Sequence, residues 1–590
     1  MESDFQKGET RLSKYVNHSI GDTIEKIYAY LNSVHTSGKF DAFNQEKPFF
    51  NIVVAAANIW FRATDIDRSQ IKIRATKQSD WLDALIFTAK LQEWMREARF
   101  GTFLNDWGRV LSRYGSCVVK FVRNSSGLHI EVKPWSSIIC DSVDFESNPH
   151  IEILELTDAQ LKQRVETHGY DKEQVDLLLA TAQTRETKDR QKKDNRAAYH
   201  KLYEIHGVLS KKCLTGEEKD KDIFVQQMHV VSFVGVNKGR RTDYQDFTLI
   251  KGEEEKDPFM LTHLIKEDDR ALSIGAVEYL FNTQWMQNHS MLAMKQQLEL
   301  ASKLIFQTAD SSFVGRNALA EIENGDILIH KENMPISQVN NQSHDMVSWS
   351  NFAVSWKSLG NELVGISEAM LGVAPKAGTA WRQTEALLAE SHSLFELMTE
   401  NKGLCIEDMM NEWILPYIQE KTLDNVDEVI MTLESHDINR IDARYVKNRA
   451  IDEGNEMFVN DVLTGKVSQV DYGAIAQNIK QGLTELGNQR SFVPTSDLKT
   501  TWKKHFSNFK YRLEVDITGE QKNVQEAMTT LNSALKMILT PGYDQNPKAQ
   551  MVVGKILELS GAMSPLEIAS MPVEVAPQVD GAGLQDDKVQ

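Results

Sequence analysis

Residues 349–379 read WSNFAVSWKSLGNELVGISEAMLGVAPKAGT, a segment patterned with large apolar residues that runs into a loop of small residues and proline. The apolar residues recur at spacings of 3 and 4, a 3.5-residue seam that predicts a long helix packed against another helix. The seam consists of Trp349, Phe352, Trp356, Leu359, Leu363, Ile366 and Met370. Glycine permits positive φ and proline cannot continue a helix, so Gly372, Pro375 and Gly378 are expected to separate this helix from the next one.

The loop GVAPKAGT at residues 372–379 is superficially similar to a phosphate-binding loop. A Walker A loop has the pattern G-x-x-x-x-G-K-[ST], in which backbone N–H groups surround the phosphates and the lysine reaches the terminal one. Here Ala377 occupies the place of the second glycine, and Gly378 occupies the place of the lysine. The preceding segment also reads as a helix and not as the strand that leads into a Walker A loop. The pattern therefore disfavours nucleotide binding at this loop.

Long helices are expected on both sides of this stretch. Residues 273–303 contain no proline and one glycine, Gly275, so the pattern predicts a helix of about 45 Å. That helix is apolar around most of its circumference and should therefore pack on more than one side. A mixed insert at 304–342 follows it. After the loop, residues 383–403 predict another helix, with Gly403 as the residue that ends it.

The composition is that of an acidic globular protein. With 590 residues the chain can bury a large core and divide into about three or four structural regions. Hydrophobic residues make up 41% and charged residues 25%, which are ordinary globular values. The 66 Lys and Arg against 84 Asp and Glu give a net charge of −18. Such a chain is poorly suited to tight wrapping of nucleic acid, although DNA could pass by without being gripped.

Cysteine spacing and hydropathy favour a soluble protein in a reducing compartment. The four cysteines include no C-x-x-C pair, which argues against a disulfide framework and against a zinc site. They are Cys117, Cys140, Cys213 and Cys405. The opening MESDFQKGETRLSKYV is charged throughout and does not resemble a signal peptide. The most apolar run, FFNIVVAAANIWF at 49–61, is too short to span a bilayer, so we expect a buried helix there and no membrane association.

The remaining patterns predict an α+β fold that is mainly helical. Residues up to about 115 read as helices that end at Gly115. CVVKFVR and LHIEVKPW, joined by a turn at 124–127, predict a β-hairpin. KGEEEKDP at 251–258 reads as a surface turn, and the alternation in YRLEVDITG at 511–519 predicts a half-buried strand. Residues 572–590 have too little apolar content to fold, so we expect a flexible tail.

Catalytic motifs are absent from the sequence. It contains no G-x-S-x-G elbow, no H-E-x-x-H, no paired C-x-x-C and no G-x-G-x-x-G after a strand. Acid–base pairs can still assemble from distant residues, so this result lowers the expectation of an enzyme without excluding one. We predict no catalytic residue, no metal ligand and no cofactor.

Three segments in a fixed order carry a resemblance to a known family. They are ENGDILIHKENMPISQVNNQSHD at 323–345, GVAPKAGTAWR at 372–382 and EALLAESHSLFELMTENKG at 385–403. Together with the order of the long helices, they closely resemble the portal proteins of tailed double-stranded DNA bacteriophages. The resemblance runs from about Phe49 to Ile538 and is strongest between Ala271 and Pro416. The first forty residues and the tail from about Ala549 are not covered.

The resemblance implies the portal-protein fold. In that family a stem helix, a clip, a second stem helix, a channel loop and a long lumen-side helix follow one another in this order. The regions implied here are an N-terminal arm and α/β wing at 1–270, a first stem helix at 271–303, a clip at 304–342, a second stem helix at 343–371, a channel loop at 372–382, a lumen-side helix at 383–403, a wing completion and helical crown at 404–571, and a flexible tail at 572–590.

The resemblance also implies a function. Portal proteins form a ring, usually of twelve subunits, at one capsid vertex, through which DNA enters during packaging and leaves during ejection. The ring docks the terminase large subunit and later the head-to-tail adaptor, contacts major capsid and scaffolding proteins, and nucleates procapsid assembly. The expected location is therefore the portal vertex of a virion assembled in the cytoplasm of a bacterial host, and the chain is not expected to be an enzyme.

Three groups of site residues follow from this placement. The stem seam would pack subunits together, although it could equally bury against its own subunit's other stem helix. The DNA-facing residues of the channel loop would be Gly372, Pro375, Lys376, Gly378, Thr379, Trp381 and Arg382. The clip residues that would dock the motor and the adaptor are Asp326, His330 and Lys331. Lys376 and Arg382 are the only charges at 372–382, so a closed ring would carry two circles of positive charge there.

Two other functions stay open on the sequence. One is a nucleotide-binding enzyme that uses the loop at 372–379. The other is a helical adaptor or scaffold that binds other proteins. Such an adaptor would stay monomeric or form small oligomers, and it would have no need of a Gly/Pro loop between two long apolar helices.

Overall fold

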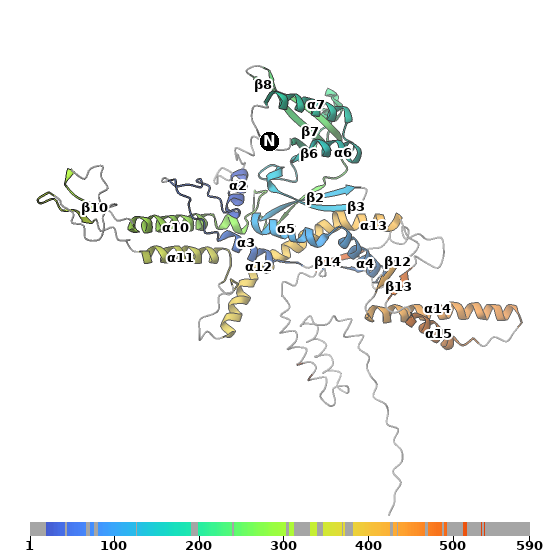
Figure 1. The fold of residues 1–590 in the computed structure, drawn as a ribbon. Coiled ribbons are helices and arrows are strands. Elements are labelled where there is room, and N and C mark those ends of the chain that lie inside the picture. The colour runs from blue at the N-terminus through green and yellow to red at the C-terminus, as the bar shows by residue number, and fades with distance from the viewer. Residues whose placement is uncertain are drawn as a thin grey trace, which may run out of the picture. The chain divides into compact units, whose positions relative to one another are not determined.

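The computed structural model of the chain describes an α+β protein that is mainly helical, as expected, with sheets of two, three and five strands (Figure 1). The described residues are 19–41, 44–66, 71–75, 81–124, 127–189, 199–238, 241–268, 270–302, 306–311, 331–338, 346–367, 370–371, 381–424, 429–432, 435–465, 470–485, 489–492, 511–515, 533 and 536. They divide into two compact units. Unit 1 is Met1–Thr76, Lys90–Ile418 and Tyr511–Ile517, and unit 2 is Lys77–Ala89, Gln419–Lys510 and Thr518–Gln590.

Unit 1 contains most of the described helices and strands. Its helices are α2 (Ile20–Leu31), α3 (Val53–Ala63), α5 (Phe100–Tyr114), α6 (Asp158–His168), α7 (Lys172–Asp189), α8 (Lys212–Thr215), α9 (Ala276–Tyr279), α10 (Phe281–Ser302), α11 (Met346–Leu363) and α12 (Trp381–Met409). Its strands are β1 (Ile71–Ala75), β2 (Ser116–Asn124), β3 (Gly127–Lys133), β4 (Ile138–Ile139), β5 (His150–Leu156), β6 (His200–Ser210), β7 (Phe224–Lys238), β8 (Arg241–Glu253), β9 (Phe259–His263), β10 (Phe306–Gln307), β11 (Ser337–Gln338) and β14 (Tyr511–Val515). The residues of α4 (Trp81–Glu97) and α13 (Leu415–Asp424) are shared between the two units.

Three helices that are far apart in the sequence, α3, α5 and α12, form the centre of unit 1. Trp60 of α3, Trp107 of α5 and Phe395 of α12 are almost completely buried. The Trp60 and Phe395 rings meet edge to face, with their centroids 6.4 Å apart. The run at 49–61 therefore forms the buried helix that its sequence predicted. Burying aromatic side chains of this size contributes about 2–3 kcal/mol each to stability.

A lysine lies inside this apolar centre. Lys402 of α12 is 2% exposed, and its Nζ donates to the carbonyl oxygen of Thr64, just past the end of α3, at 2.5 Å. The same Nζ lies 5.4 Å from the centroid of the Trp107 ring. Burial lowers the pKa of Lys402 to about 8, against the opposing influence of Asp65 and Cys405. The contact fixes α12 to α3, although desolvation of the ammonium opposes it.

Helix α12 continues past Gly403, so the prediction that this glycine ends the helix is wrong. The apolar stripe carries on beyond the glycine, and its buried members are Ile406, Met409, Met410 and Ile414. Burial of these side chains outweighs the roughly 1 kcal/mol by which glycine is less favourable than alanine inside a helix. Packing has therefore overridden a local signal for a helix end.

A π turn at Met410–Ile414 links α12 to α13. Pro416 explains it, because proline lacks an N–H and its ring would clash with the carbonyl of Glu412 in a regular α-helix. Lys256 satisfies that carbonyl, with Nζ at 3.2 Å, and also binds the Glu412 carboxylate at 2.8 Å. Trp413, inside the turn, has its ring centroid 4.5 Å from the same Nζ.

A three-stranded antiparallel sheet in the order β3-β2-β9 packs on these helices. The predicted hairpin is confirmed as the pair β2–β3. Gly115 ends α5 as predicted, in a left-handed conformation with φ of 77°, and a Cβ there would lie 2.6 Å from the backbone of Ile274. Phe121 of β2 stacks on Trp413 with the ring centroids 4.9 Å apart, which joins the sheet to the π turn.

A second sheet has five antiparallel strands in the order β4-β5-β6-β7-β8, with α6 and α7 packed on one face (Figure 1). Its core is separate from the core of the three-stranded sheet. The buried residues under α6 and α7 include Leu156, Leu161, Leu178, Leu202, Val230 and Phe247. The buried residues of the other core include Ile20, Val118, Trp135, Phe259, Leu261 and Leu272.

Unit 2 contains a small antiparallel pair of strands and a helical hairpin. The strands are β12 (Val429–Thr432) and β13 (Gln489–Phe492), and the helices are α14 (Ser435–Leu463) and α15 (Tyr472–Glu485). Gly454 of α14 faces the ring of Tyr472, which would overlap a Cβ at that position. The two helices therefore approach closely through a small residue.

The strand expected at 511–519 is present as β14, which pairs with β1. The flexible tail expected at 572–590 lies outside the described residues. Within the described part of the chain, no helix has the length and apolar character needed to cross a bilayer.

Raising the pH should stabilise the protein through Lys402. Its folded pKa of about 8 lies below its ordinary value of 10.5, so between these values the unfolded chain binds more protons and stability rises with pH. Replacing Lys402 with methionine should remove about 3 kcal/mol of this rise. Urea unfolding between pH 7 and 10 would measure it, with Lys162→Met, an exposed lysine of α6, as the control. A pH-independent difference between wild type and Lys402→Met would contradict the account.

Candidate assembly site

Helices α10 and α11 lie side by side and antiparallel (Figure 1). They correspond to the two long helices expected at 273–303 and 343–371. The first begins later than expected, because the short helix α9 precedes it and Leu280 separates the two. In the insert between them, the described strands β10 and β11 form a two-residue antiparallel ladder.

Helix α11 ends at Leu363, before the expected boundary. Gly365 is left-handed, with φ of 69°, and its N–H donates to the carbonyl of Glu362 at 3.1 Å. The N–H of Ile366 donates to the carbonyl of Asn361 at 2.8 Å. These two bonds are the Schellman arrangement, which closes a helix at a glycine. Gly365 is itself the sequence signal for this helix end. The regular apolar spacing continues past it to Ile366 and Met370, so the sequence predicted a longer helix.

The chain is joined to α3 both before and after residues 372–380. Before them, the carbonyl of Val364 accepts a hydrogen bond from Nε1 of Trp60 at 2.9 Å. After them, Lys402 of α12 binds the carbonyl of Thr64. Both bonds are buried, so each is worth more than an exposed one and would leave an unsatisfied polar group if broken.

Small residues allow α10 and α11 to approach closely. A Cβ on Gly360 of α11 would lie 2.6 Å from Cγ2 of Thr283 on α10. Seven residues further along each antiparallel helix, Ser290 and Ala353 are also buried. A pair of small positions seven residues apart is a sequence signal for this contact. The predicted seam does not include these positions, because it consists only of large side chains.

The buried face of α10 is also polar. Gln284 accepts from the N–H of Ile52 at 2.9 Å and donates to the carbonyl of Phe50 at 2.7 Å. Asn288 accepts from the N–H of Phe50 at 3.2 Å. The two amide side chains thus hold the segment that leads into α3. Gln287 is buried too, and its Oε1 has no hydrogen-bond partner among the described residues.

Three of the seven residues of the predicted seam are exposed to solvent in the single chain. Phe352, Leu359 and Leu363 are 42%, 57% and 58% exposed. The half-buried or buried members are Trp349, Trp356, Ile366 and Met370, of which the last two lie beyond the end of α11. The Phe352 ring meets the two tryptophan rings edge to face at 6.4 and 6.2 Å. The contact between α10 and α11 is therefore made by the small residues, and α10 does not cover the large apolar side chains at the centre of the seam.

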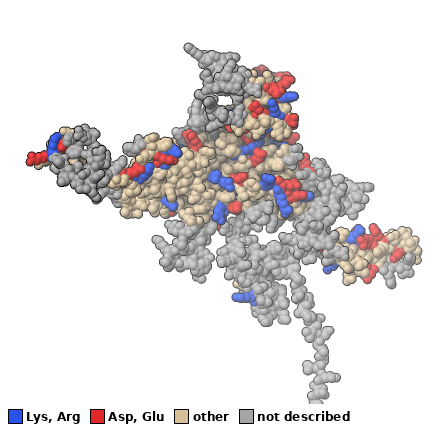
Figure 2. All heavy atoms as spheres, in the orientation of Figure 1, with Lys and Arg blue, Asp and Glu red and all other residues tan. Residues whose placement is uncertain are grey.

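Both helices carry further exposed apolar side chains and little charge. These side chains are Trp285 and Leu298 on α10, and Val347 and Val354 on α11. Each helix has two charged residues, and Figure 2 shows few charged atoms on the visible surface over α10 and α11. These exposed apolar side chains make the helix pair a candidate interaction surface.

One of the three predicted clip residues lies among the described residues. Lys331 has its Nζ 3.0 Å from Oδ1 of Asp310, and its N–H donates to Oδ2 of Asp310 at 3.3 Å. The Asp310 carboxylate is buried, so this pair closes the base of the insert beside the β10–β11 ladder. Lys331 therefore binds Asp310 within the insert. The other two predicted clip residues, Asp326 and His330, lie outside the described residues.

Most of the predicted channel loop lies outside the described residues. Residues 372–380 lie outside the described part of the chain, and this range includes Gly372, Pro375, Lys376, Gly378 and Thr379. Trp381 and Arg382 form the start of α12. The helix therefore includes the last two residues of the expected loop at 372–382, whose predicted end is wrong by two residues.

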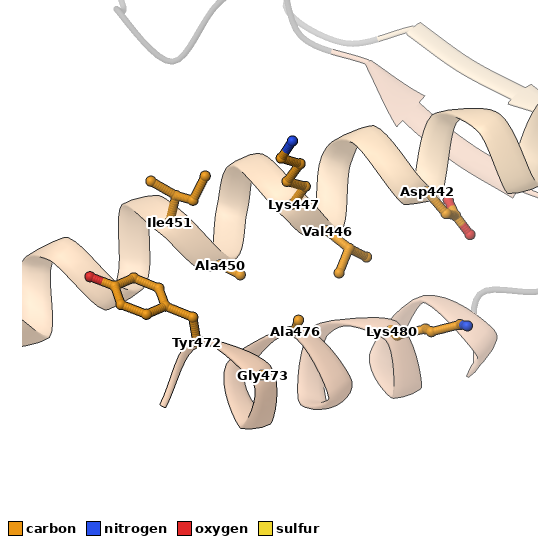
Figure 3. A pocket seen from close by; sticks show the side chains of 9 residues that line it. All are labelled: Asp442, Val446, Lys447, Ala450, Ile451, Tyr472, Gly473, Ala476 and Lys480. Atoms are coloured by element: carbon orange, nitrogen blue, oxygen red, sulfur yellow. The ribbon is translucent and has the colours of Figure 1, made fainter. Parts of the chain in front are cut away.

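A groove lies between the two helices of unit 2 (Figure 3). It has a volume of about 620 Å³, and Val446, Ala450 and Ala476 line it between the two helices. The charged side chains of Asp442 and Lys480 lie at one end of the groove, and Tyr472 lies at the other. Among the described residues, no cluster of His, Cys, Asp and Glu could hold a metal ion.

Comparison with known proteins adds no family assignment. No model of a protein family matches the chain, and no curated protein matches it either.

A side chain at Gly360 should force α10 and α11 apart. The Cβ of Gly360→Ala would meet Thr283 well inside van der Waals distance, so we expect a loss of about 1–3 kcal/mol in the free energy of unfolding. The matched control is Gly101→Ala in α5, where a Cβ meets nothing within 4 Å and a helical alanine should be neutral or slightly stabilising. Denaturant unfolding of both variants tests this, and equal stability would contradict the close approach.

Proposed function

We propose that this chain is the portal protein of a tailed double-stranded DNA bacteriophage. The proposal would make the chain one subunit of a ring at a capsid vertex that conducts DNA during packaging and ejection. Its main support is the hairpin of α10 and α11, whose large apolar side chains stay exposed and which leads directly toward the Gly/Pro loop. The resemblance of three segments, in the same order as in portal proteins, is the second support.

The exposed seam favours self-assembly. A ring made from one kind of chain needs a heterologous interface that closes, in which one face of each subunit meets a different face of the next. An exposed row of Phe352, Leu359 and Leu363, with few charges nearby, suits one side of such an interface. Burying apolar surface contributes about 25 cal/mol per Å², so a few half-exposed leucines and aromatic side chains supply several kcal/mol per contact.

The net charge of the chain suits a DNA channel better than a protein that binds DNA tightly. A net charge of −18 gives DNA little general attraction, and a continuous basic lining would hold the phosphates and oppose movement. Lys376 and Arg382 would then supply local positive charge at the narrowest part of the channel. In this proposal the clip residues, with Asp326 and His330 among them, dock the terminase large subunit and then the head-to-tail adaptor.

The two alternative functions make different predictions. A nucleotide-binding enzyme would bind ATP or GTP at 372–379, and calorimetry would detect it. A helical adaptor would stay monomeric or form small oligomers and would use the apolar face of α11 for another protein. The portal proposal gives a reason for a Gly/Pro sequence between two long apolar helices, and an adaptor would have no need of one.

The native mass tests ring assembly. Mass photometry at moderate salt should show a species near 804 kDa, twelve times 67.0 kDa, or one subunit either side. The double variant Leu359→Lys and Leu363→Lys should fold but remain monomeric, because it places two charges in an interface that excludes water. The control is Leu177→Lys, an exposed leucine of α7 away from the hairpin, which should still assemble. A wild-type protein of one to four subunits at micromolar concentration would count against the ring.

The role of the two loop charges can be tested independently of ring assembly. Replacing Lys376 and Arg382 together by alanine should leave the native mass unchanged but alter DNA packaging or retention in an assembly assay. The expected cause is loss of the local attraction for phosphates. Replacing Lys357, an exposed lysine of α11, by alanine controls for a general loss of charge. Unchanged packaging and retention in the double variant would remove these residues from the channel.

A further inference from the structure

Helix α11 exposes apolar side chains on two opposite sides of its contact with α10. Successive residues of a helix are about 100° apart, and the buried Gly360 and Ala353 mark the direction of α10. Three exposed apolar residues lie roughly 80–120° from this direction on one side, and two lie roughly 100–120° from it on the other. The first three are Phe352, Leu359 and Leu363, here called the leucine face. The other two are Val347 and Val354, which are 70% and 64% exposed.

A polar strip separates these two sets on the side of α11 that points away from α10. All of its members are exposed, and they are Ser348, Asn351, Ser355, Ser358 and Glu362. A helix that binds one partner through a single face carries one continuous apolar stripe. The exposed apolar side chains of α11 therefore form two surfaces with different directions.

The segment that leads into α3 adds a phenylalanine to the second surface. Asn288 of α10 accepts a hydrogen bond from the N–H of Phe50 at 3.2 Å, and Gln284 donates to its carbonyl at 2.7 Å. The Phe50 ring is 46% exposed, and its centroid lies 5.8 Å from Nζ of Lys357, which is one turn along α11 from Val354. The second surface, here called the valine face, consists of Phe50, Val347 and Val354.

Two apolar faces on opposite sides of one helix pair suit repeated association of identical chains. In a heterologous contact, one face of a chain meets a different face of the next chain, so every chain must carry both. A two-fold dimer would bury one of these faces twice and leave the other exposed. The opposite directions of the leucine face and the valine face therefore favour the heterologous contact.

The exposed apolar area is close to what such a contact needs. The side chains of the leucine face are 42–58% exposed, and those of the valine face are 46–70% exposed. Large apolar side chains have areas on the order of 150–250 Å², so these six expose roughly 100 Å² each and roughly 600 Å² together. The smallest stable interfaces bury about 1,200 Å², of which about 60% is apolar. The two faces supply most of that apolar area, in nearly equal shares.

We propose that the leucine face of one chain binds the valine face of a second copy, so that Phe50 and the segment around it form part of the contact between copies. This inference rests on the self-assembly put forward under the proposed function, and it adds the second face and the direction of the contact. Repetition of the contact gives a ring when the rotation between copies closes. The polar strip is covered by neither partner.

A mixture of two blocked variants tests the direction of the contact. Leu359→Lys with Leu363→Lys blocks the leucine face, and Val347→Lys with Val354→Lys blocks the valine face. Each variant alone should sediment as a monomer at tens of micromolar, because a lysine must lose its water to enter an apolar contact. The equimolar mixture should form a species near 134 kDa, twice 67.0 kDa, and nothing larger. Each such pair retains one intact face of each kind, and these two faces bind each other.

Phe50→Lys tests the part played by the segment before α3. It should behave as a blocked valine face, monomeric alone and paired near 134 kDa with the leucine-face variant. The matched control is a chain with all four lysine substitutions on α11, which should pair with neither double variant. Far-UV circular dichroism of each variant checks that it is folded.

The possible results separate this inference from the proposed function. A folded valine-face variant that assembles like the wild-type chain would overturn the inference, and so would a mixture that remains monomeric. If the wild-type chain forms rings while the blocked variants fail to pair, the inference is wrong and the portal proposal stands. If the variants pair but the wild-type chain forms open chains instead of a ring, the inference holds and the portal proposal is wrong.

Discussion

The hydrogen bond from Lys402 to the carbonyl of Thr64 is the contact round which the centre of unit 1 is arranged. It joins α12 to the end of α3 inside an apolar core, where neither group can form a hydrogen bond with water. The neighbouring bond from Trp60 to Val364 fixes the end of α11 to the same helix. The described helices on either side of residues 372–380 are thereby both joined to α3.

Helices α10 and α11 use different side chains for their mutual contact and for their exposed surface. Their mutual contact relies on small and polar residues such as Gly360 and Thr283, which permit close approach but bury little apolar area. The large side chains of α11, Phe352 and Leu359 among them, face outward instead. If the two helices buried their large side chains against each other, the single chain would be more stable but would expose less apolar surface. This division is the physical basis for proposing an assembly in which the apolar face is covered.

Local chemistry explains what could and could not be predicted from the sequence. The hairpin β2–β3, the end of α5 at Gly115 and the strand β14 followed from alternation and from glycine, which act over a few residues. Gly403 and Gly365 show the limit, because the same residue lies inside one helix and ends another according to what packs around it. The buried ion pairs of Lys120 with Glu152 and Glu204 were not predictable, since these residues are distant in sequence. The run at 251–258, read as a surface turn, brings Glu254 to His206 and Lys256 to Glu412 in the π turn.

The π turn before Pro416 has a further consequence for how this region can change. It contains one residue more than an α-helical turn, so it rotates the helical phase by about 100° and offsets the apolar stripe of α13 from that of α12. Deleting one residue within it would bring the stripes back into phase but would move Trp413 away from Phe121 and Lys256. Chain length here is therefore constrained to the single residue.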